Sequence, residues 1–524
     1  MSRPEQQSFA LHHKRCHCCG DRGASAGGQI PRRDFLAIGG LTLGGLALTG
    51  LDWHSVAAAA TEAPAPSRTP LVVKPVFMYE IPQRRPQTSW RSWGGVQTQE
   101  DANQEVARIQ KELGQVRQQA DFPVTFLPPA PVRSPAELQQ VQDLAQADAI
   151  MVYGAGGPAA IFDAVLKTGK PMIIFLRHRS GPVSLWYEII SPRYLHQHTD
   201  TLAVKGVDNG DVVVDSLDEV TWRLRALCGL KNTLGAKIVA VGGPGGWACP
   251  QAPDLARDRF RLDISTVSYE DLAKLIQEAR GVDVAVQSAK QSADKYLSDP
   301  GVKLETDRKF VENAFLLAQI FRGLMAKAGA RMMTINSCMG TIMPMSETTS
   351  CLPLSVLNDE GYFAFCESDF VVIPSGILLG SISGRPQFLN DPTYPHDGII
   401  TLAHCTAPRK NDGQNLDPAR LVTHFESDYG ASPKVEMRKG QKVTNIIPDF
   451  KAERWTGFVG EIVEVPFLPI CRSQIDVAYQ CADARVAENM PGFHWMTCYG
   501  DYSRELAYVL KRLPIKWENL VPVV

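Results

Sequence analysis

The sequence predicts an α/β fold in which strands and helices alternate through two doubly wound units. Apolar, strand-like runs bounded by Gly and Pro alternate with longer stretches of helical periodicity. The run at 171–176 is almost continuously apolar, as expected for a strand of a parallel sheet that is covered on both faces. With 44% hydrophobic and 21% charged residues, the chain of 524 residues has enough apolar material for a large core divided among several domains.

The first unit is expected to span residues 71–185. Its first strand is predicted at 72–79, and a polar, amphipathic helix follows at 99–120. The other predicted elements of this unit are strands at 123–127, 149–153 and 171–176 and a helix at 158–167.

The second unit is expected at 186–385, with its first strand around Val213. A helix at 377–382 is predicted near its end, and a strand at 387–390, beyond it, leads the chain to Asp391. The elements between these points are helices at 217–230, 269–280 and 307–327 and strands at 237–241 and 332–335.

The N-terminal segment has the pattern of an export signal. Arg32 and Arg33 precede an uncharged stretch at 37–51 and a run of small residues at 55–60. This order is typical of a twin-arginine signal with a peptidase site, and the stretch is shorter than the roughly twenty residues of a membrane span. We therefore expect a removable signal at 1–59, a Pro-rich linker at 60–70, and export to the periplasm by the twin-arginine translocase. The alternative interpretation is a buried N-terminal helix.

Charge and hydropathy exclude two classes of partner. Without residues 1–59, 48 basic and 52 acidic residues remain, so the net charge of the expected mature chain is −4. A weakly acidic chain offers no electrostatic attraction to nucleic acid. No later apolar run is long enough to span a membrane, so we expect no stable membrane span.

The cysteines give no sign of a disulfide framework. Three of the twelve, Cys16, Cys18 and Cys19, lie in the expected signal, and the other nine are widely spaced without a CxxC pair. An odd number at such spacing argues against systematic pairing. Most of these cysteines are therefore expected to be small, buried, apolar residues.

Two glycine-rich segments, 154–157 and 242–246, each follow a predicted strand. Neither has the GxGxxG spacing, and Pro158 and Pro244 remove amides that a phosphate cradle would use. Two interpretations stay open. Their backbone amides bind an anion or a sugar hydroxyl, or the segments are tight strand-to-helix turns at the carboxyl edge of a sheet.

Two carboxylates in the C-terminal half are candidates for chemistry. Glu367 follows a run of aromatic and small residues, so we expect it at a strand end with little water around it. Burial of a carboxylate is costly unless a cation or a hydrogen-bond donor compensates its charge. Asp391 ends the strand predicted at 387–390, and the two carboxylates are expected to converge.

With these residues, the chain resembles the L-fucose isomerase family of metal-dependent aldose-ketose isomerases. The resemblance covers most of residues 70–524 and is specific in the C-terminal half. That family holds a divalent manganese with a Glu, an Asp and a late His. The matching positions are Glu367 in Cys-Glu-Ser-Asp, Asp391 in Leu-Asn-Asp-Pro and His494 in Gly-Phe-His-Trp. The interval of 24 residues from Glu367 to Asp391 is also that of the family.

The resemblance implies two Rossmann-like domains followed by a β-rich C-terminal domain, here at 386–524. It also implies Mn²⁺ or another divalent cation on Glu367, Asp391 and His494, and assembly as a homo-trimer or hexamer. Two hard carboxylates and one imidazole with open positions suit such an ion. Glu367 and Asp391 would be the catalytic residues, which transfer a proton through a cis-enediol.

Some features depart from the family pattern. Phe493 stands where the family has Asn, and the segment between Asp391 and His494 is shorter. The related L-arabinose isomerases use a Glu, Glu, His, His ligand set, so Asp391 favours the fucose-type arrangement.

Three neighbouring side chains have two interpretations each. His404 either faces the site or ends a strand, and Asp369 either supports the site or caps a helix. Trp495 either stacks on the apolar face of a sugar or belongs to the core.

The leading hypothesis is an exported, manganese-dependent isomerase that acts on a sugar. One alternative is an exported carbohydrate-binding or accessory protein on the same fold without turnover. Another is a different metal-dependent reaction through an enediol, such as epimerisation or lyase cleavage. A complete ligand set favours an enzyme, because simple binding has no need of it.

Overall fold

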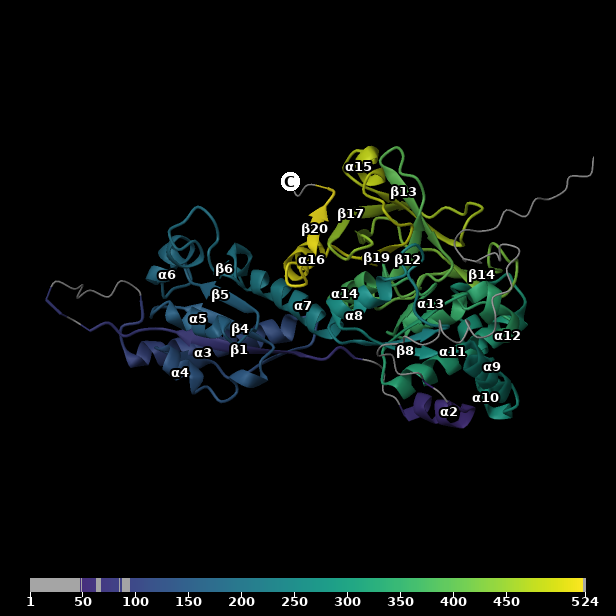
Figure 1. The fold of residues 1–524 in the computed structure, drawn as a ribbon, viewed down its shortest axis with the longest axis horizontal. Coiled ribbons are helices and arrows are strands. Elements are labelled where there is room, and N and C mark those ends of the chain that lie inside the picture. Colours follow the sequence, from purple (N-terminus) through teal and green to yellow (C-terminus); the bar gives the residue numbers. More distant parts are fainter. Residues whose placement is uncertain (1–47, 49, 63–66, 84, 87–94, 522–524) are drawn as a thin grey trace, which may run out of the picture.

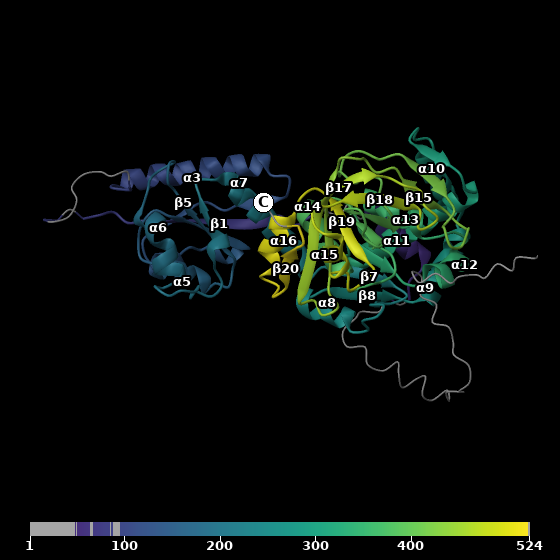
Figure 2. The same cartoon turned by 90° about the horizontal axis from the view of Figure 1, so that it is seen from above.

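The computed structural model describes residues 48, 50–62, 67–83, 85–86 and 95–521. These residues form two lobes (Figure 1; Figure 2). One lobe contains a parallel sheet formed by strands between residues 71 and 214. The other contains a second parallel sheet and a closed antiparallel sheet. The predicted mixed α/β class is therefore confirmed.

The first lobe is a six-stranded parallel sheet in the order β2-β1-β4-β5-β6, with β3 beside β1. The strands are β1 (Leu71–Met78), β2 (Val124–Phe126), β3 (Ala130–Val132), β4 (Ala149–Gly154), β5 (Met172–Leu176) and β6 (Val212–Val214). The helices are α3 (Gln99–Gln119), α4 (Pro135–Gln139), η1 (Leu144–Gln146), α5 (Ala160–Leu166), α6 (Leu185–Ile189), the π-helical turn η2 (Ile190–Leu195) and η3 (Asn209–Asp211).

The end of this unit differs from the prediction. Because β6 pairs with β5, the first unit continues to Val214 and does not end at residue 185. A long helical connection at 185–211 separates the two strands, which is why the sequence suggested a boundary there.

The predicted helix at 99–120 forms as α3, with ends set by local chemistry. The Thr98 hydroxyl accepts a hydrogen bond from the amide of Asp101, and the Asp101 carboxylate accepts one from the amide of Thr98. This capping box fixes the first turn. Ile109, Leu113 and Val116 form a buried stripe at helical spacing, so α3 covers the sheet with one face.

The second parallel sheet has the order β11-β10-β7-β8. Its strands are β7 (Lys237–Val241), β8 (Asp263–Val267), β10 (Met332–Ile335) and β11 (Phe363–Phe365). The helices are α7 (Leu217–Thr233), α8 (Ala252–Phe260), α9 (Tyr269–Arg280), α10 (Asp283–Leu297), α11 (Arg308–Ala328), the π-helical turn η4 (Cys338–Ile342), α12 (Met343–Ser346), α13 (Cys351–Asp359) and α14 (Ile373–Ser383). The elements predicted at 237–241, 269–280 and 332–335 have the predicted bounds.

The C-terminal region confirms the expected β-rich part. Six antiparallel strands form a closed ring, because β16 pairs with both β19 and β17. They are β12 (Phe388–Pro392), β13 (Ile399–His404), β16 (Lys442–Ile447), β17 (Arg454–Glu464), β18 (Ser473–Ala478) and β19 (Trp495–Tyr499). Around them lie β20 (Lys516–Asn519), α15 (Asp483–Ala487), α16 (Ser503–Leu510) and a small sheet of β9 (Val302–Leu304), β14 (Ala419–Val422) and β15 (Ser432–Val435).

Part of the expected export signal is a packed helix. Residues 1–47, with the paired arginines, lie outside the described residues, but α2 (Trp53–Glu62) overlaps the run of small residues at 55–60. Trp53 is 6% and Val56 0% exposed, and Val56 fits against Gly323 of α11, where a Cβ atom would lie 2.3 Å from it. Cleavage near residue 59 stays a prediction, and such cleavage would remove this packed helix.

Among the described residues, no helix combines the length and the apolar character needed to cross a membrane.

Candidate metal centre

The site lies where the carboxyl edge of the second parallel sheet meets three strands of the closed sheet. Glu367 follows β11, and the parallel arrangement brings the residues after β7 and β10 to the same edge. On the other side, β12 pairs with β13 and with β19 in the registers Asp391 to Ala403 and Asn390 to Trp495. These registers place Asp391 next to both His404 and His494.

Strand alternation turns two of these side chains toward the second sheet. Leu389 and Met496 pack in the core cluster shared with the helices of that sheet, whereas Trp495 packs inside the closed sheet. Side chains two residues apart point to the same face of a strand. Asp391 therefore points to the same side as Leu389, and His494 to the same side as Met496.

The three predicted ligands converge. Nε2 of His494 lies 3.3 Å from Oε2 of Glu367 and 3.4 Å from Oδ1 of Asp391. All three atoms are buried, and none makes a hydrogen bond within the described structure. Buried polar atoms that make no hydrogen bond are rare, and these three are compensated only by the ion pairs among them. His494 thus lies between the two predicted carboxylates, but the donor atoms that all lie within 4.8 Å of one another form the groups Asp391, His404, His494 and Cys366, Glu367, His404.

The orientation of His494 is set by Asp369. The Asp369 carboxylate accepts a hydrogen bond from Nδ1 of His494 at 2.7 Å, and its Oδ1 also accepts one from the amide of Val371 at 3.0 Å. Asp369 therefore supports the site, and it does not cap a helix, because α14 begins after Val372 without a side-chain cap. Because Nδ1 donates its hydrogen to Asp369, Nε2 carries the free lone pair. Histidines that bind a metal ion commonly donate a hydrogen bond from their other ring nitrogen to a carboxylate in this way.

His404 is a fourth donor that the resemblance did not include. It ends β13, and its Nε2 lies 3.6 Å from Oε1 of Glu367. Its Nδ1 lies 2.8 Å from the hydroxyl of Thr406, so Nε2 is the nitrogen that faces the site. Asp391, His404 and His494 each offer an atom within 4.8 Å of the others. His404 thus both ends a strand and faces the site.

The backbone at Glu367 is unusual. Glu367 and Ser368 have φ angles of 68° and 47°, in the left-handed region that residues other than glycine rarely adopt. The turn after β7 holds this segment: the Gly245 amide donates to the carbonyl of Ser368 at 3.0 Å, and the Gly245 carbonyl accepts from Phe370 at 3.0 Å. The segment 242–246 is therefore a turn at the carboxyl edge that supports the site, in line with the second interpretation.

The electrostatics show a site that attracts positive charge. Burial opposes a charge on Glu367, but the imidazoles of His404 and His494 outweigh it and lower the pKa of Glu367 to about 2. Burial raises the pKa of Asp391 to about 6. Burial would lower the imidazole pKa values, but the carboxylates outweigh it. Glu367 and Asp391 raise the pKa of His404, and Asp369 and Glu367 raise that of His494.

These donors fit a divalent cation. Ligands at roughly 2.1 Å from one ion lie roughly 3.0–3.5 Å apart, close to the 3.4 Å between His494 and Asp391 and the 3.3 Å between His494 and Glu367. The complete group of three donors on this side is Asp391, His404 and His494. The Asp391 side chain is 21% exposed, against 8% for Glu367 and 1% for His494. Open coordination positions for a substrate are therefore expected on the side of Asp391.

The aromatic residues around the site differ from the expectation. Trp495 is fully buried and packs against Phe458, so it belongs to the core. Instead, Trp247, just after the glycine turn, has its ring centroid 5.7 Å from that of His494 and 4.6 Å from that of Phe493. Phe493 is 38% exposed.

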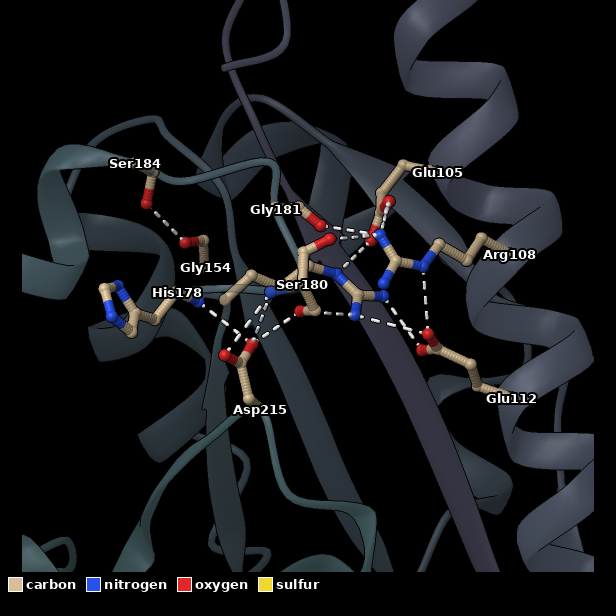
Figure 3. A network of polar contacts seen from close by, with 10 residues as sticks. Glu105, Arg108, Glu112, Gly154, His178, Ser180, Gly181, Ser184 and Asp215 are labelled. Carbon is tan, nitrogen blue, oxygen red and sulfur yellow. Dashed lines mark hydrogen bonds and ion pairs between the residues drawn. The ribbon is translucent and has the colours of Figure 1, made fainter. Parts of the chain in front are cut away.

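The first lobe has its own network of polar residues at the end of β5 (Figure 3). Arg177 is ion-paired with Glu105 and Glu112 of α3, and the Asp215 carboxylate accepts hydrogen bonds from the amides of His178 and Arg179. Since these charges compensate one another, we interpret this network as structural.

Against the models of known families and the curated proteins, the chain gives no match. The resemblance to L-fucose isomerases therefore stays a prediction.

Proposed function

We propose that the protein is a metal-dependent aldose-ketose isomerase, as the resemblance to the L-fucose isomerase family implies. The observation that supports the proposal is that Nε2 of His494 lies within 3.4 Å of a carboxylate oxygen of Glu367 and of one of Asp391, while these three buried atoms make no hydrogen bond. With His404, the donors are two carboxylates and two imidazoles. This set combines the Asp of the fucose type with the two histidines of the arabinose isomerases. Oxygen and imidazole donors with open positions suit Mn²⁺ or a similar divalent ion.

A divalent cation on these residues would polarise the carbonyl of an open-chain sugar and orient the adjacent hydroxyl. The protein's own groups would then move protons. Asp391, 21% exposed against 8% for Glu367, is the carboxylate nearer to a substrate and would act as the general base. It would carry the carbon-bound proton from C2 to C1 through a cis-enediol. Glu367 would carry the hydroxyl proton from O2 to O1.

The aromatic pair Trp247 and Phe493 completes the proposal for substrate binding. Both rings lie beside His494, and Phe493 is partly exposed. An aromatic surface of this kind suits the apolar face of a sugar.

Three further expectations belong to the same proposal. They are the Rossmann-like character of the two parallel layers, export to the periplasm by the twin-arginine translocase, and assembly as a homo-trimer or hexamer.

The test is a panel of aldoses given to the Mn²⁺-loaded protein in deuterated water. An isomerase forms ketose and incorporates deuterium at the carbon that receives the proton. We expect Glu367→Gln and Asp391→Asn to abolish both signals, with Glu488→Gln, at an exposed position, as the matched control. Product formation by Glu367→Gln would remove that residue from the mechanism.

The same experiment separates the alternatives. A carbohydrate-binding protein without turnover would bind a sugar but exchange no deuterium. An epimerase would exchange deuterium at one carbon without forming ketose, and a lyase would give two shorter products.

A further inference from the structure

A small enclosed cavity lies against the candidate metal centre and has a different chemical character. Its volume is about 20 Å³, enough for one water molecule or one ion. Glu367 and His404 line it, whereas Asp391 and His494 do not. The other lining side chains that carry ligand atoms are Cys338, Met339, Cys351, Cys366, Cys405, Thr406, His424, Glu426 and Cys471.

The gathering of thiols corrects part of the sequence expectation. The cysteines described are not joined by disulfides, and Cys338, Cys351, Cys366 and Cys405 are buried as expected. However, these four residues line one cavity together with Cys471, next to a carboxylate and an imidazole. Thiols in this position are potential ligands and not only apolar filling.

Three of the lining residues form a donor group. Sγ of Cys366, a carboxylate oxygen of Glu367 and a ring nitrogen of His404 all lie within 4.8 Å of one another. Asp391, His404 and His494 form the second group with this property. The two groups share His404. Its Nδ1 is engaged with the hydroxyl of Thr406, which leaves Nε2 as the nitrogen available to an ion in either group.

The two donor groups differ in hardness. The group on the side of Asp391 has imidazole and carboxylate ligands, which suit Mn²⁺, whereas the cavity side adds a thiol. Thiolate, imidazole and carboxylate together are typical ligands of Zn²⁺. A soft ion and a hard ion would therefore prefer different sides of His404.

We propose that the cavity side binds a thiophilic divalent cation of the Zn²⁺ class through Cys366, Glu367 and His404. The thiol of Cys366 releases its proton to solvent when its sulfur binds the ion. Because Nε2 of His404 binds one ion at a time, this cation and a harder ion held by Asp391 and His494 compete. The inference uses residues of the proposed isomerase site but does not require that the protein turn over a sugar.

X-ray absorption on the unaltered, Zn²⁺-loaded protein is the first test. We expect a sulfur neighbour at about 2.3 Å from the zinc, together with nitrogen and oxygen neighbours. The Co²⁺-loaded protein should show sulfur-to-cobalt charge-transfer absorption. A shell of nitrogen and oxygen alone would overturn the proposal, and this result needs no variant that might fail to fold.

Variants then assign the sulfur. Cys366→Ser should weaken Zn²⁺ binding by more than the roughly 10–100-fold that loss of an outer hydrogen-bond partner costs. The affinity for Mn²⁺ should change little. Cys338→Ser is the matched control, because it removes a thiol of the same cavity that belongs to neither donor group. Equal weakening in both variants, or no weakening in Cys366→Ser, would contradict the assignment.

Competition is measured by titrating Zn²⁺ into the Mn²⁺-loaded protein and following the manganese by electron paramagnetic resonance. We expect release of one Mn²⁺ for each Zn²⁺ bound. Simultaneous binding of both ions would contradict the sharing of His404. If the bound zinc has a sulfur neighbour but the protein forms no ketose, only the proposed isomerase function is refuted.

Discussion

The Asp369 carboxylate holds Nδ1 of His494 at 2.7 Å and so turns Nε2 of the same ring toward Glu367 and Asp391. Loss of such a support typically weakens metal binding by roughly 10–100-fold. We therefore expect Asp369→Asn to lower the affinity for Mn²⁺ by this order, as measured by calorimetric titration. The amide oxygen of Asn can still accept from the Val371 amide, so this contact of the turn is kept. Asp254→Asn, at an exposed surface pair, is the control. An unchanged affinity in Asp369→Asn would show that His494 needs no such support.

Metal binding should strengthen as pH rises. In the metal-free protein the neighbouring carboxylates outweigh burial and raise the pKa values of His404 and His494 above 6.5. A protonated imidazole cannot bind a metal ion, so each proton must be displaced. The affinity should rise by up to about 10-fold per pH unit for each displaced proton while pH passes through these pKa values. Asp391, with its pKa raised to about 6, adds to the same trend below that pH.

The same pKa shifts of His404 and His494 determine how the stability of the metal-free fold changes with pH. A raised imidazole pKa stabilises the metal-free fold fully below 6.5, and this contribution is lost as pH rises through the raised value. The increase in Tm on adding Mn²⁺ should therefore be larger at about pH 8 than at about pH 6. Thermal unfolding with and without Mn²⁺ across this range is the measurement. A pH-independent increase would mean that neither histidine binds the ion.

The left-handed backbone at Ser368 gives a prediction on stability. Ser368 has a φ of 47°, is fully buried, and its hydroxyl has no hydrogen-bond partner. Glycine removes the strain at such a position, so we expect Ser368→Gly to raise the free energy of unfolding by roughly 1 kcal/mol. Ser381→Gly is the matched control, because Ser381 is equally buried and unpartnered but helical, and should lose roughly 0.5–1 kcal/mol. Chemical denaturation measures both. Destabilisation of both variants alike would show that the turn stores no strain.

Helix α2 gives a prediction that bears on export. Leu51, Trp53 and Val56 are buried, and each fully buried side chain of this kind contributes roughly 1.5–3 kcal/mol. A chain that starts at residue 60, as after the predicted cleavage, should therefore have a lower Tm than a chain that starts at residue 48. Equal Tm values would show that α2 adds nothing to the core, in line with a removable signal.

The strongly periodic elements were predictable, whereas long-range pairings were not. The strand at 237–241 and the helix at 269–280 stand out by pattern alone, and both have the predicted bounds. In contrast, β8 (Asp-Ile-Ser-Thr-Val) was not predicted, because it lacks the continuous apolar run expected of a strand in a covered parallel sheet. The pairing of β6 with β5 depends on contacts across the long connection between them, so the first boundary was placed too early.

In the candidate site, too, the residues in local motifs were predictable and those placed by long-range contacts were not. Glu367, Asp391 and His494 could be named from the resemblance, since each matches a motif. The role of His404 depends on the register between β12 and β13, which no local pattern reveals. Asp369 reaches His494 because two left-handed residues precede it, and the thiols of the cavity come from separate segments whose spacing carries no signal.

The most direct test of the central claim is anomalous diffraction from a crystal soaked in Mn²⁺. The account predicts one strong peak a little over 2 Å from ligand atoms of Glu367, Asp391, His404 and His494. A manganese peak elsewhere, or no peak beside Nε2 of His494, would contradict it.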